Sequence, residues 1–288
     1  MTTNRRSRRT WALLQCGALV LTMPALVVLA KTVKAAYDRP VPAVYDTLAR
    51  FLPANALNLR LEKSSASGIY RFEAQSSAGG LKGEVTTRGT FLWLASPAQA
   101  NDLPRHLRES LLPGTSREQP RIERVHVMAF EIETMEPSGA ELERFVDAQG
   151  HLLFEVVNEP ETDELDVSEN FEDLPAPVAG TILHHVGSRP LTRLQEEVEL
   201  GSPIHAATWQ SGHGEQEVKV LDSGLTLFLE LPSDEPVPPE VLRQVPDAAD
   251  VEALILETYW LLDRDGEVLR AVLSNGTPLF APERHASQ

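Results

Sequence analysis

The sequence contains one cysteine, Cys16, among its 288 residues. The chain that follows it can form no internal disulfide and offers no thiolate, so its stability must come from packing. Several enzyme motifs are also absent: there is no nucleophile elbow, no His-Glu-x-x-His sequence, no phosphate-binding loop and no dinucleotide fingerprint. We therefore predict a protein that is not an enzyme, with no catalytic residue, no cofactor and no metal ion.

Acidic residues are missing from the first 35 positions, which hold six basic residues, although the whole chain has a formal net charge of −16. The body behind this segment is thus strongly acidic. Such a body repels nucleic-acid phosphates and anionic lipid headgroups, so we expect no nucleic-acid partner. It attracts basic partners or cations, although negative charge also serves solubility.

The N-terminal segment has the pattern of an export signal. Arginines at positions 5, 6, 8 and 9 precede a nearly uncharged run over residues 11–30. Basic residues ahead of an apolar run stay in the cytoplasm, so the rest of the chain is expected outside it. The run of 20 residues is long enough to span a membrane. Small residues at Ala30 and Ala35 equally suit cleavage by signal peptidase.

We therefore predict that residues 1–36 are a signal peptide or a membrane anchor. The body would lie on the periplasmic side of the inner membrane, held there through residues 11–30 if they are uncleaved, or be secreted to the periplasm. The Arg8-Arg9 pair resembles a twin-arginine export signal, but a plain basic flank is the favoured interpretation. For Cys16, a free thiol within the apolar run is favoured over a lipoprotein site.

Four prolines divide the body into similar segments. Pro42, Pro104, Pro175 and Pro239 are spaced by 62, 71 and 64 residues, and apolar residues recur three or four positions apart after each. Proline suits the first turn of a helix, and this periodicity is typical of one apolar stripe. Each segment therefore predicts a short helix that packs on a sheet.

Alternating stretches after each helix predict antiparallel strands, among them residues 57–61, 125–127, 130–133, 142–146, 198–200, 207–209, 218–220, 254–262 and 268–273. Each segment then closes with a glycine and a short apolar strand, predicted at residues 91–94, 152–154, 225–228 and 279–280. Gly150 and Gly276 follow turn residues, so we expect a positive φ at both.

The predicted fold class is α+β. It consists of four tandem units, each with one short helix and an antiparallel sheet of three to four strands. One helix on so small a sheet is marginal, which favours pairing of the units into two domains at residues 37–157 and 174–288. Residues 158–173 hold eight acidic residues and no basic one, so we expect a solvated acidic linker there.

The second segment resembles a known family. Residues 130–133, Gly139 and the sequence Phe145-Val146-Asp147-Ala148-Gln149-Gly150-His151-Leu152-Leu153 are similar to the core of the PepSY domain. The helix that follows Leu103-Pro104 resembles the PepSY-like group related to the β-lactamase-inhibitor protein. The resemblance implies a secreted or membrane-tethered, non-catalytic module of tandem repeats with a concave sheet, which binds or inhibits another protein. It names no partner.

Other candidate sites find less support. His184, His185, His205 and His213 fall in one segment but lack metal-site spacing, so solvent-facing histidines are expected. The acidic residues of 158–173 lack the order of a calcium loop. The large aromatics in strand patterns are expected in the core or on a sheet face; they are Trp93, Trp209, Tyr259 and Trp260.

The predicted function is a non-catalytic protein-binding module of the cell envelope, with inhibition as one form of its action, and its partner is another envelope or secreted protein. Two alternatives stay open at this stage. The first is a structural or assembly scaffold of the envelope, and the second is a hydrolytic enzyme of unrecognised type. An exposed apolar or aromatic sheet face would favour binding, whereas a deep pocket with converging carboxylates or histidines would favour an enzyme.

Overall fold

The computed structural model describes residues 40–64, 68–77, 79–112, 121–135, 139–158, 167–168, 170–212, 214–246 and 249–280. The predicted export segment 1–36, including Cys16, lies outside these residues, as does His213. Within the described part of the chain, no helix is both long and apolar enough to cross a membrane.

Four α-helices begin at the predicted prolines or one residue after them; they are α2 (Pro42–Phe51), α3 (Arg105–Leu111), α4 (Ala176–Val186) and α5 (Pro239–Leu242). The chain enters each helix from an extended residue, and no side chain caps the first turn. Proline fits these positions because its fixed φ suits the helix and its missing N–H would have no partner there. The predicted helix starts are thus confirmed.

Antiparallel strands make up most of the molecule, and together they form one sheet of fourteen strands. The strands of the first part of the chain are β1 (Leu57–Lys63), β2 (Ile69–Ser76), β3 (Gly79–Thr86), β4 (Phe91–Ala98), β5 (Arg121–Met135), β6 (Glu141–Asp147) and β7 (Leu152–Asn158). Those of the second part are β8 (Val167–Ser168), β9 (Leu191–Glu199), β10 (Ser202–Ser211), β11 (Gly214–Leu221), β12 (Thr226–Glu230), β13 (Asp250–Leu262) and β14 (Val268–Leu273). The fold is therefore a mixed α+β fold, as predicted.

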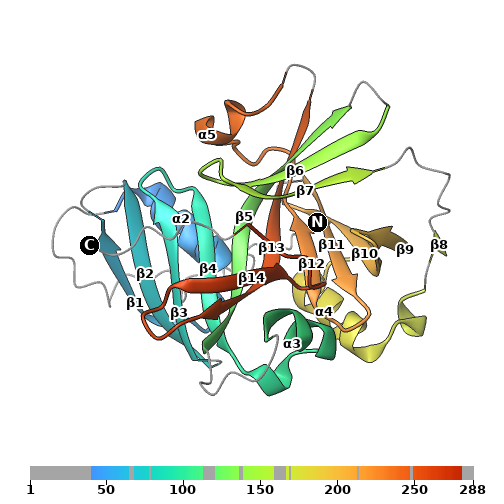
Figure 1. Ribbon diagram of the computed structural model, residues 1–288, viewed down its shortest axis with the longest axis horizontal. Helices are drawn as coiled ribbons and strands as arrows, with labels where there is room; N and C mark the ends of the chain where they lie inside the picture. The colour runs from blue at the N-terminus through green and yellow to red at the C-terminus, as the bar shows by residue number, and fades with distance from the viewer. Residues whose placement is uncertain are drawn as a thin grey trace, which may run out of the picture.

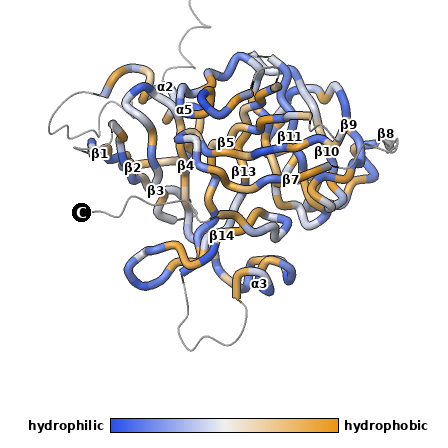
Figure 2. The backbone as a smooth tube through the Cα atoms, turned by 45° about the horizontal axis from the view of Figure 1, so that its top comes forward, coloured by the Kyte–Doolittle hydropathy of each residue, from blue (hydrophilic) through white to orange (hydrophobic). Residues whose placement is uncertain are grey.

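Two long strands, β5 and β13, lie at the centre of the sheet (Figure 1). Their pairing runs without interruption from Asp250 opposite Glu133 to Leu262 opposite Arg121. At its other edge β5 pairs with β4 along its first half and with β6 along its second half. In the same way β13 pairs with β12 and then β14. Hydrophilic and hydrophobic stretches alternate along both strands (Figure 2).

The core crosses the predicted boundary between two domains. Val44 and Leu48 of α2 pack in one cluster with Val241 of α5, Phe130 of β5 and Ile255 of β13. A second cluster on the opposite face of the sheet also joins residues from both parts. The two parts thus share one sheet and its cores, which differs from the expected pair of separate cores. The physical reason is that β5 belongs to the first part and β13 to the second, and the two strands pair directly. Apolar side chains on each face of this pair therefore pack in one cluster with residues of both parts.

The local predictions differ from the structure at three places. Residues 125–133 form part of one long strand, β5, where two short alternating stretches were predicted. Residues 279–280 form no strand; Leu279 and Phe280 instead donate single backbone hydrogen bonds to Ala271 and Leu153. The described part of the acidic segment 158–173 holds strand β8 and a 3-10 helix over Phe171–Asp173, whereas residues 159–166 lie outside the described residues.

Candidate functional site

Carboxylates face one another across the central strands. Glu131 of β5 lies opposite Glu252 of β13, and Glu133 of β5 lies opposite Asp250. On its other side Glu133 lies opposite Glu143 of β6. Directly opposed residues of neighbouring strands point to the same face, and like charges in such pairs are destabilising.

The neighbouring strands extend this surface. Glu217 of β11 lies opposite Glu230 of β12, and the register places both on the same face as Leu254 of β13. That face is the one turned away from the helices, because Leu254 belongs to the core cluster in which no helix residue takes part. We call this surface the acidic face; it comprises Glu131, Glu133, Glu143, Glu199, Glu217, Glu230 and Glu252, together with Lys219.

Curvature of the sheet brings distant strands together at the acidic face. In the sheet, β9 is separated from β6 by five strands. Burial is the largest cause of the raised pKa values of Glu131 and Glu143, yet Glu199 at the end of β9 raises both further. On the same face, the rings of Phe145 in β6 and Phe228 in β12 have their centroids 5.7 Å apart, although β5 and β13 lie between these two strands. In a flat sheet strands so placed would be about 14 Å apart. The acidic face therefore lies on the inside of a curved sheet.

Lys219 of β11 is the basic residue among these carboxylates. Its Nζ lies 2.9 Å from Oε2 of Glu199 and 3.3 Å from Oε1 of Glu230. Burial lowers the pKa of Lys219, but Glu199 and Glu230 outweigh that effect and hold the pKa above its ordinary value. Lys219 is thus charged at every physiological pH and joins β9, β11 and β12 across the face.

Several of the carboxyl groups hold protons near neutral pH. Burial, followed by the charge of Glu143, raises the pKa of Glu131 to about 9. Burial, followed by Glu199, raises the pKa of Glu143 to about 7. Burial also raises the pKa of Glu230 to about 7, although Lys219 opposes the shift. The protons reduce repulsion among groups that cannot all ionise together.

The corresponding surface of the first part of the chain is balanced in charge. On β3, Glu84 lies 3.0 Å from Arg71, and Lys82 lies 2.7 Å from Glu123 of β5. Arg121 also pairs with Glu123, at 3.3 Å. One sheet thus carries matched charges on β2–β5 and crowded carboxylates on β5, β6 and β9–β13.

A hollow of about 720 Å³ adjoins the acidic face beyond the end of β12. It is lined by strands β11 and β13 and by the connection from β12 to α5. Five glutamates and one arginine contribute to its walls; they are Glu215, Glu217, Glu230, Glu235, Glu252 and Arg193. Glu235 pairs with Arg50 at 2.5 Å and Glu230 with Lys219 at 3.3 Å. The excess of negative charge in the hollow therefore comes from Glu215, Glu217 and Glu252, and it favours a basic occupant.

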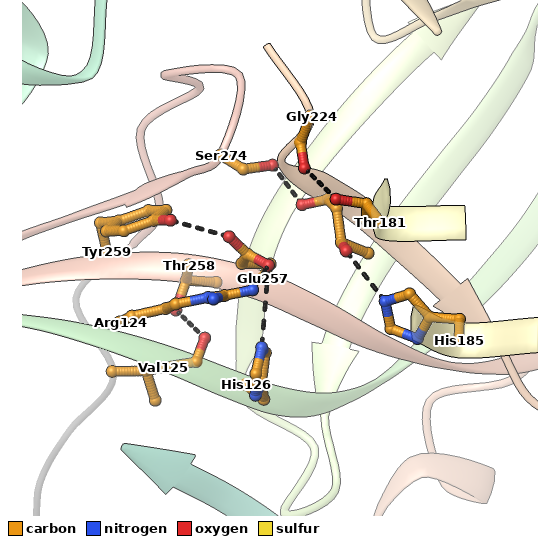
Figure 3. A network of polar contacts seen from close by, with 11 residues as sticks. Arg124, Val125, His126, Thr181, His185, Gly224, Glu257, Thr258, Tyr259 and Ser274 are labelled. Atoms are coloured by element: carbon orange, nitrogen blue, oxygen red, sulfur yellow. Dashed lines mark hydrogen bonds and ion pairs between the residues drawn. The ribbon is translucent and has the colours of Figure 1, made fainter. Parts of the chain in front are cut away.

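A second polar cluster lies on the other face of the β5–β13 pair (Figure 3). The fully buried carboxylate of Glu257 accepts hydrogen bonds from Arg124 at 2.5 Å and from the Tyr259 hydroxyl at 2.8 Å. The ring of His126 lies 3.7 Å from the same carboxylate. Burial raises the pKa of Glu257, but His126 and Arg124 outweigh it and lower the pKa. The carboxylate of Glu257 is thus held by Arg124, His126 and Tyr259 of the same two strands, which fits a structural role.

The predicted histidines occupy different environments. His184 is exposed, as expected. The expectation was wrong for His205, which is buried and lies 2.9 Å from Asp222. His185 is half-buried and lies 3.1 Å from the Thr226 hydroxyl, and burial lowers its pKa to about 4. Among the described residues, no group of histidines, cysteines and carboxylates could hold a metal ion.

Sequence reasoning did not identify the acidic face. Its signal was present as alternating pairs, Glu131 with Glu133 inside a predicted strand and Glu215 with Glu217 just before another. An alternating acidic row reads as an ordinary solvated strand face until the partners of each strand are known. Of the aromatics, Trp209, Tyr259 and Trp260 are buried, in agreement with a core role.

Neither a protein-family model nor a curated protein sequence matches the chain. Among solved structures, a BLIP-like protein from Bacteroides fragilis is similar over 45% of this chain and 94% of its own, with 16% identity and a TM-score of 0.28. A DUF2874 family protein from Bacteroides ovatus is similar over 45% of this chain and 95% of its own, with 15% identity and a TM-score of 0.28. At so low a TM-score the likeness carries no argument about function.

Proposed function

We propose that the protein is a non-catalytic binding module of the cell envelope whose acidic face takes up a lysine- or arginine-rich surface of another protein. The observation that carries this proposal is the direct opposition of carboxyl groups on neighbouring strands, as in Glu131 with Glu252 and Glu217 with Glu230. Both members of such a pair cannot ionise without repulsion, so Glu131 holds its proton in the free protein. Cationic side chains of a partner would let these carboxyl groups ionise and pair with them. Sequences depart from locally stable choices chiefly where function requires it.

The balanced surface on β2–β5 supports this assignment. There Arg71 and Lys82 neutralise Glu84 and Glu123 on strands of the same sheet. This fold can therefore pair opposite charges on its strands. Among the described residues no ion pair involves Glu131 or Glu133, and the architecture does not impose that difference. The contrast favours binding at the second surface.

The hollow beside the acidic face gives the partner a point of attachment. Its volume of about 720 Å³ suits a few side chains and not a whole folded element. Arginine is enriched among the side chains that anchor protein interfaces, because its planar guanidinium pairs with carboxylates through two hydrogen bonds. We expect an arginine or lysine of the partner to enter near Glu217 and Glu252.

The location of the module belongs to the same proposal. Export through residues 11–30 would place the acidic face outside the cytoplasm, next to other envelope or secreted proteins. Inhibition of such a protein would follow if the bound surface is part of its active site. A periplasm-dependent reporter enzyme fused after Gln288 should be active, whereas activity of a reporter that works only in the cytoplasm would refute export.

The architecture of four units is also part of the proposal. Each of the four helices is followed by antiparallel strands, and a turn glycine with positive φ follows in each segment, at Gly89, Gly150, Gly224 and Gly276. These glycines contact α2, α5, α4 and α3 in that order. Four diverged copies of one helix-and-sheet unit account for this recurrence.

Binding can be tested with a defined cationic probe. A fluorescent decapeptide of alternating arginine and glycine should bind to residues 37–288, and its affinity should fall as salt screens the charges. The double substitution Glu217→Gln and Glu252→Gln should weaken binding about tenfold or more. The control, Glu62→Gln with Glu73→Gln, removes two exposed charges of β1 and β2 and should leave affinity nearly unchanged. Equal losses in both variants would show that net charge alone attracts the peptide.

A further inference from the structure

Two of the four helices cover the strands that follow them directly in the chain. A Cβ placed on Gly89 would lie 2.8 Å from the carbonyl oxygen of Ala43 in α2. The Thr47 hydroxyl of the same helix donates a hydrogen bond to the carbonyl of Gly89. In the second part of the chain, Gly224 lies against Pro177 of α4 in the same way. There the Thr181 hydroxyl donates to the carbonyl of Gly224, at 2.5 Å.

The other two helices are exchanged between the two parts. Gly150, in the turn between β6 and β7, lies against Glu240 of α5. Gln244, just past that helix, donates a hydrogen bond to the carbonyl of Gly150. Gly276, in the turn after β14, lies against Ser110 of α3. Figure 1 shows α5 beside β6 and β7 and shows α3 next to β14.

Packing of the buried side chains follows the same exchange. Leu107 and Leu111 of α3, both fully buried, pack with Tyr259 of β13 and Val272 of β14. The guanidinium of Arg270 in β14 also donates to the carbonyl of Ser110 in α3. These contacts tie a helix of the first part to strands of the second.

The reciprocal contact comes from α5. Val241 of α5, also fully buried, packs with Phe130 of β5 and with Val146 and Ala148 at the end of β6. A helix of the second part thus covers strands of the first. The relation is mutual, as it is between the subunits of a dimer with swapped elements.

We propose that the chain is built as a fused dimer, in which residues 40–158 and 170–280 each hold a helix of the other and stay joined without the connecting segment. The central pairing of β5 with β13 adds a continuous backbone ladder along the whole length of β13. Among the described residues, Gly150 of the first part is covered by a helix of the second part, and Gly276 of the second part by a helix of the first. The contacts between the described residues should therefore be enough to hold the two parts together after the chain is cut.

Cleavage of the connection tests the proposal in the full protein. Residues 161–166 are replaced by a recognition sequence for a site-specific protease, and the purified protein is cut. The fragments should elute together from a sizing column under native conditions and separate only in denaturant. Separate elution without denaturant would overturn the proposal.

Two matched substitutions show whether the exchanged helix holds the fragments together. Leu107→Ala truncates a fully buried leucine of α3, and Leu48→Ala truncates a fully buried leucine of α2, a helix whose main contacts are with β3 and β4 of its own part. In the cut protein, exchange of a fragment with a labelled copy should be at least about tenfold faster for Leu107→Ala than for Leu48→Ala. Equal exchange rates would show that α3 does not secure the two parts.

Discussion

At the scale of single residues, the two faces of the β5–β13 pair manage charge in opposite ways. Glu257 is fully buried but is held by Arg124 and Tyr259, so it stays ionised. Glu131 is only half-buried, yet it is surrounded by other carboxylates and keeps its proton. The two carboxyl groups differ in protonation because of the side chains around them and not because of how deeply they are buried. A buried carboxylate ionises when cationic donors surround it.

The substitution Arg124→Ala should lower the free energy of unfolding by roughly 1–3 kcal/mol, because the fully buried carboxylate of Glu257 loses its arginine. The Arg124 side chain is 42% exposed, and solvent screening limits the loss. Urea unfolding monitored by tryptophan fluorescence would measure the loss. The control is Arg105→Ala, which removes an exposed partner of Glu109 and should change stability by less than about 0.5 kcal/mol. Similar losses for both variants would contradict the assigned role of the buried pair.

The acidic face should make the protein less stable as the pH rises. In the folded state the pKa values of Glu131, Glu143 and Glu230 are about 9, 7 and 7, above the ordinary 4.5. The folded state therefore binds more protons than the unfolded state between these limits, and the stability gained at low pH is lost as the pH rises through 7 and then 9.

Glu131→Gln should flatten this dependence. At pH 9 the variant should be more stable than the parent by roughly 0.2–1 kcal/mol, because an uncharged amide replaces one member of a repelling cross-strand pair. At pH 5, where the parent carboxyl is protonated, the two should be nearly equal. Urea titrations at the two pH values decide the matter, and a parent protein that grows more stable from pH 5 to pH 9 would refute the assignment.

At the scale of elements, the turn glycines join the sheet to the helices. Gly150 has a φ of 84° and Gly276 a φ of 93°, so the positive φ predicted at both is confirmed. Two separate features require glycine at position 150. Its positive φ disfavours any side chain, and a Cβ there would lie 2.9 Å from the Glu240 carbonyl oxygen. The sequence pattern revealed the first requirement but not the second.

Comparison of two glycines separates these effects. Gly139→Ala introduces a side chain at a φ of 87° with no atom within 4 Å, so it should cost only the backbone strain of about 1 kcal/mol. Gly150→Ala has a similar φ and must also displace α5, so its cost should be larger, in the range of about 1–3 kcal/mol. Thermal unfolding of both variants gives the difference. Equal costs would mean that α5 is not packed against the turn.

At the scale of the whole molecule, the shared core predicts one unfolding transition. Val241 of α5 and Val44 of α2 belong to the same cluster although they come from opposite ends of the body. Fluorescence reports on Trp93 in the first part and on Trp209 and Trp260 in the second. Their single-tryptophan variants should give coincident transitions, because one cooperative unit unfolds together. Two separated transitions would restore the expected independence of residues 37–157 and 174–288.

Much of the local structure could be predicted from the sequence because it depends on near neighbours. Pro42, Pro104, Pro175 and Pro239 mark the helix starts through their fixed φ, and alternation identified β6, β13 and β14 closely. The closing strand at residues 279–280 was wrong, because a short apolar pair after a turn does not reveal whether a free strand edge lies beside it.

Composition and pattern by themselves determined the mixed α+β class, the four short helices, the turn glycines and the acidity of the body. The tertiary structure alone decided which strands lie side by side. Pairing of β5 with β13 merged the predicted cores and placed Glu131 opposite Glu252. With this pairing α3 packs on strands of the second part and α5 on strands of the first. The reason is physical: periodicity records which side of a strand is buried, whereas strand pairing depends on contacts between residues more than a hundred positions apart, which no local pattern encodes.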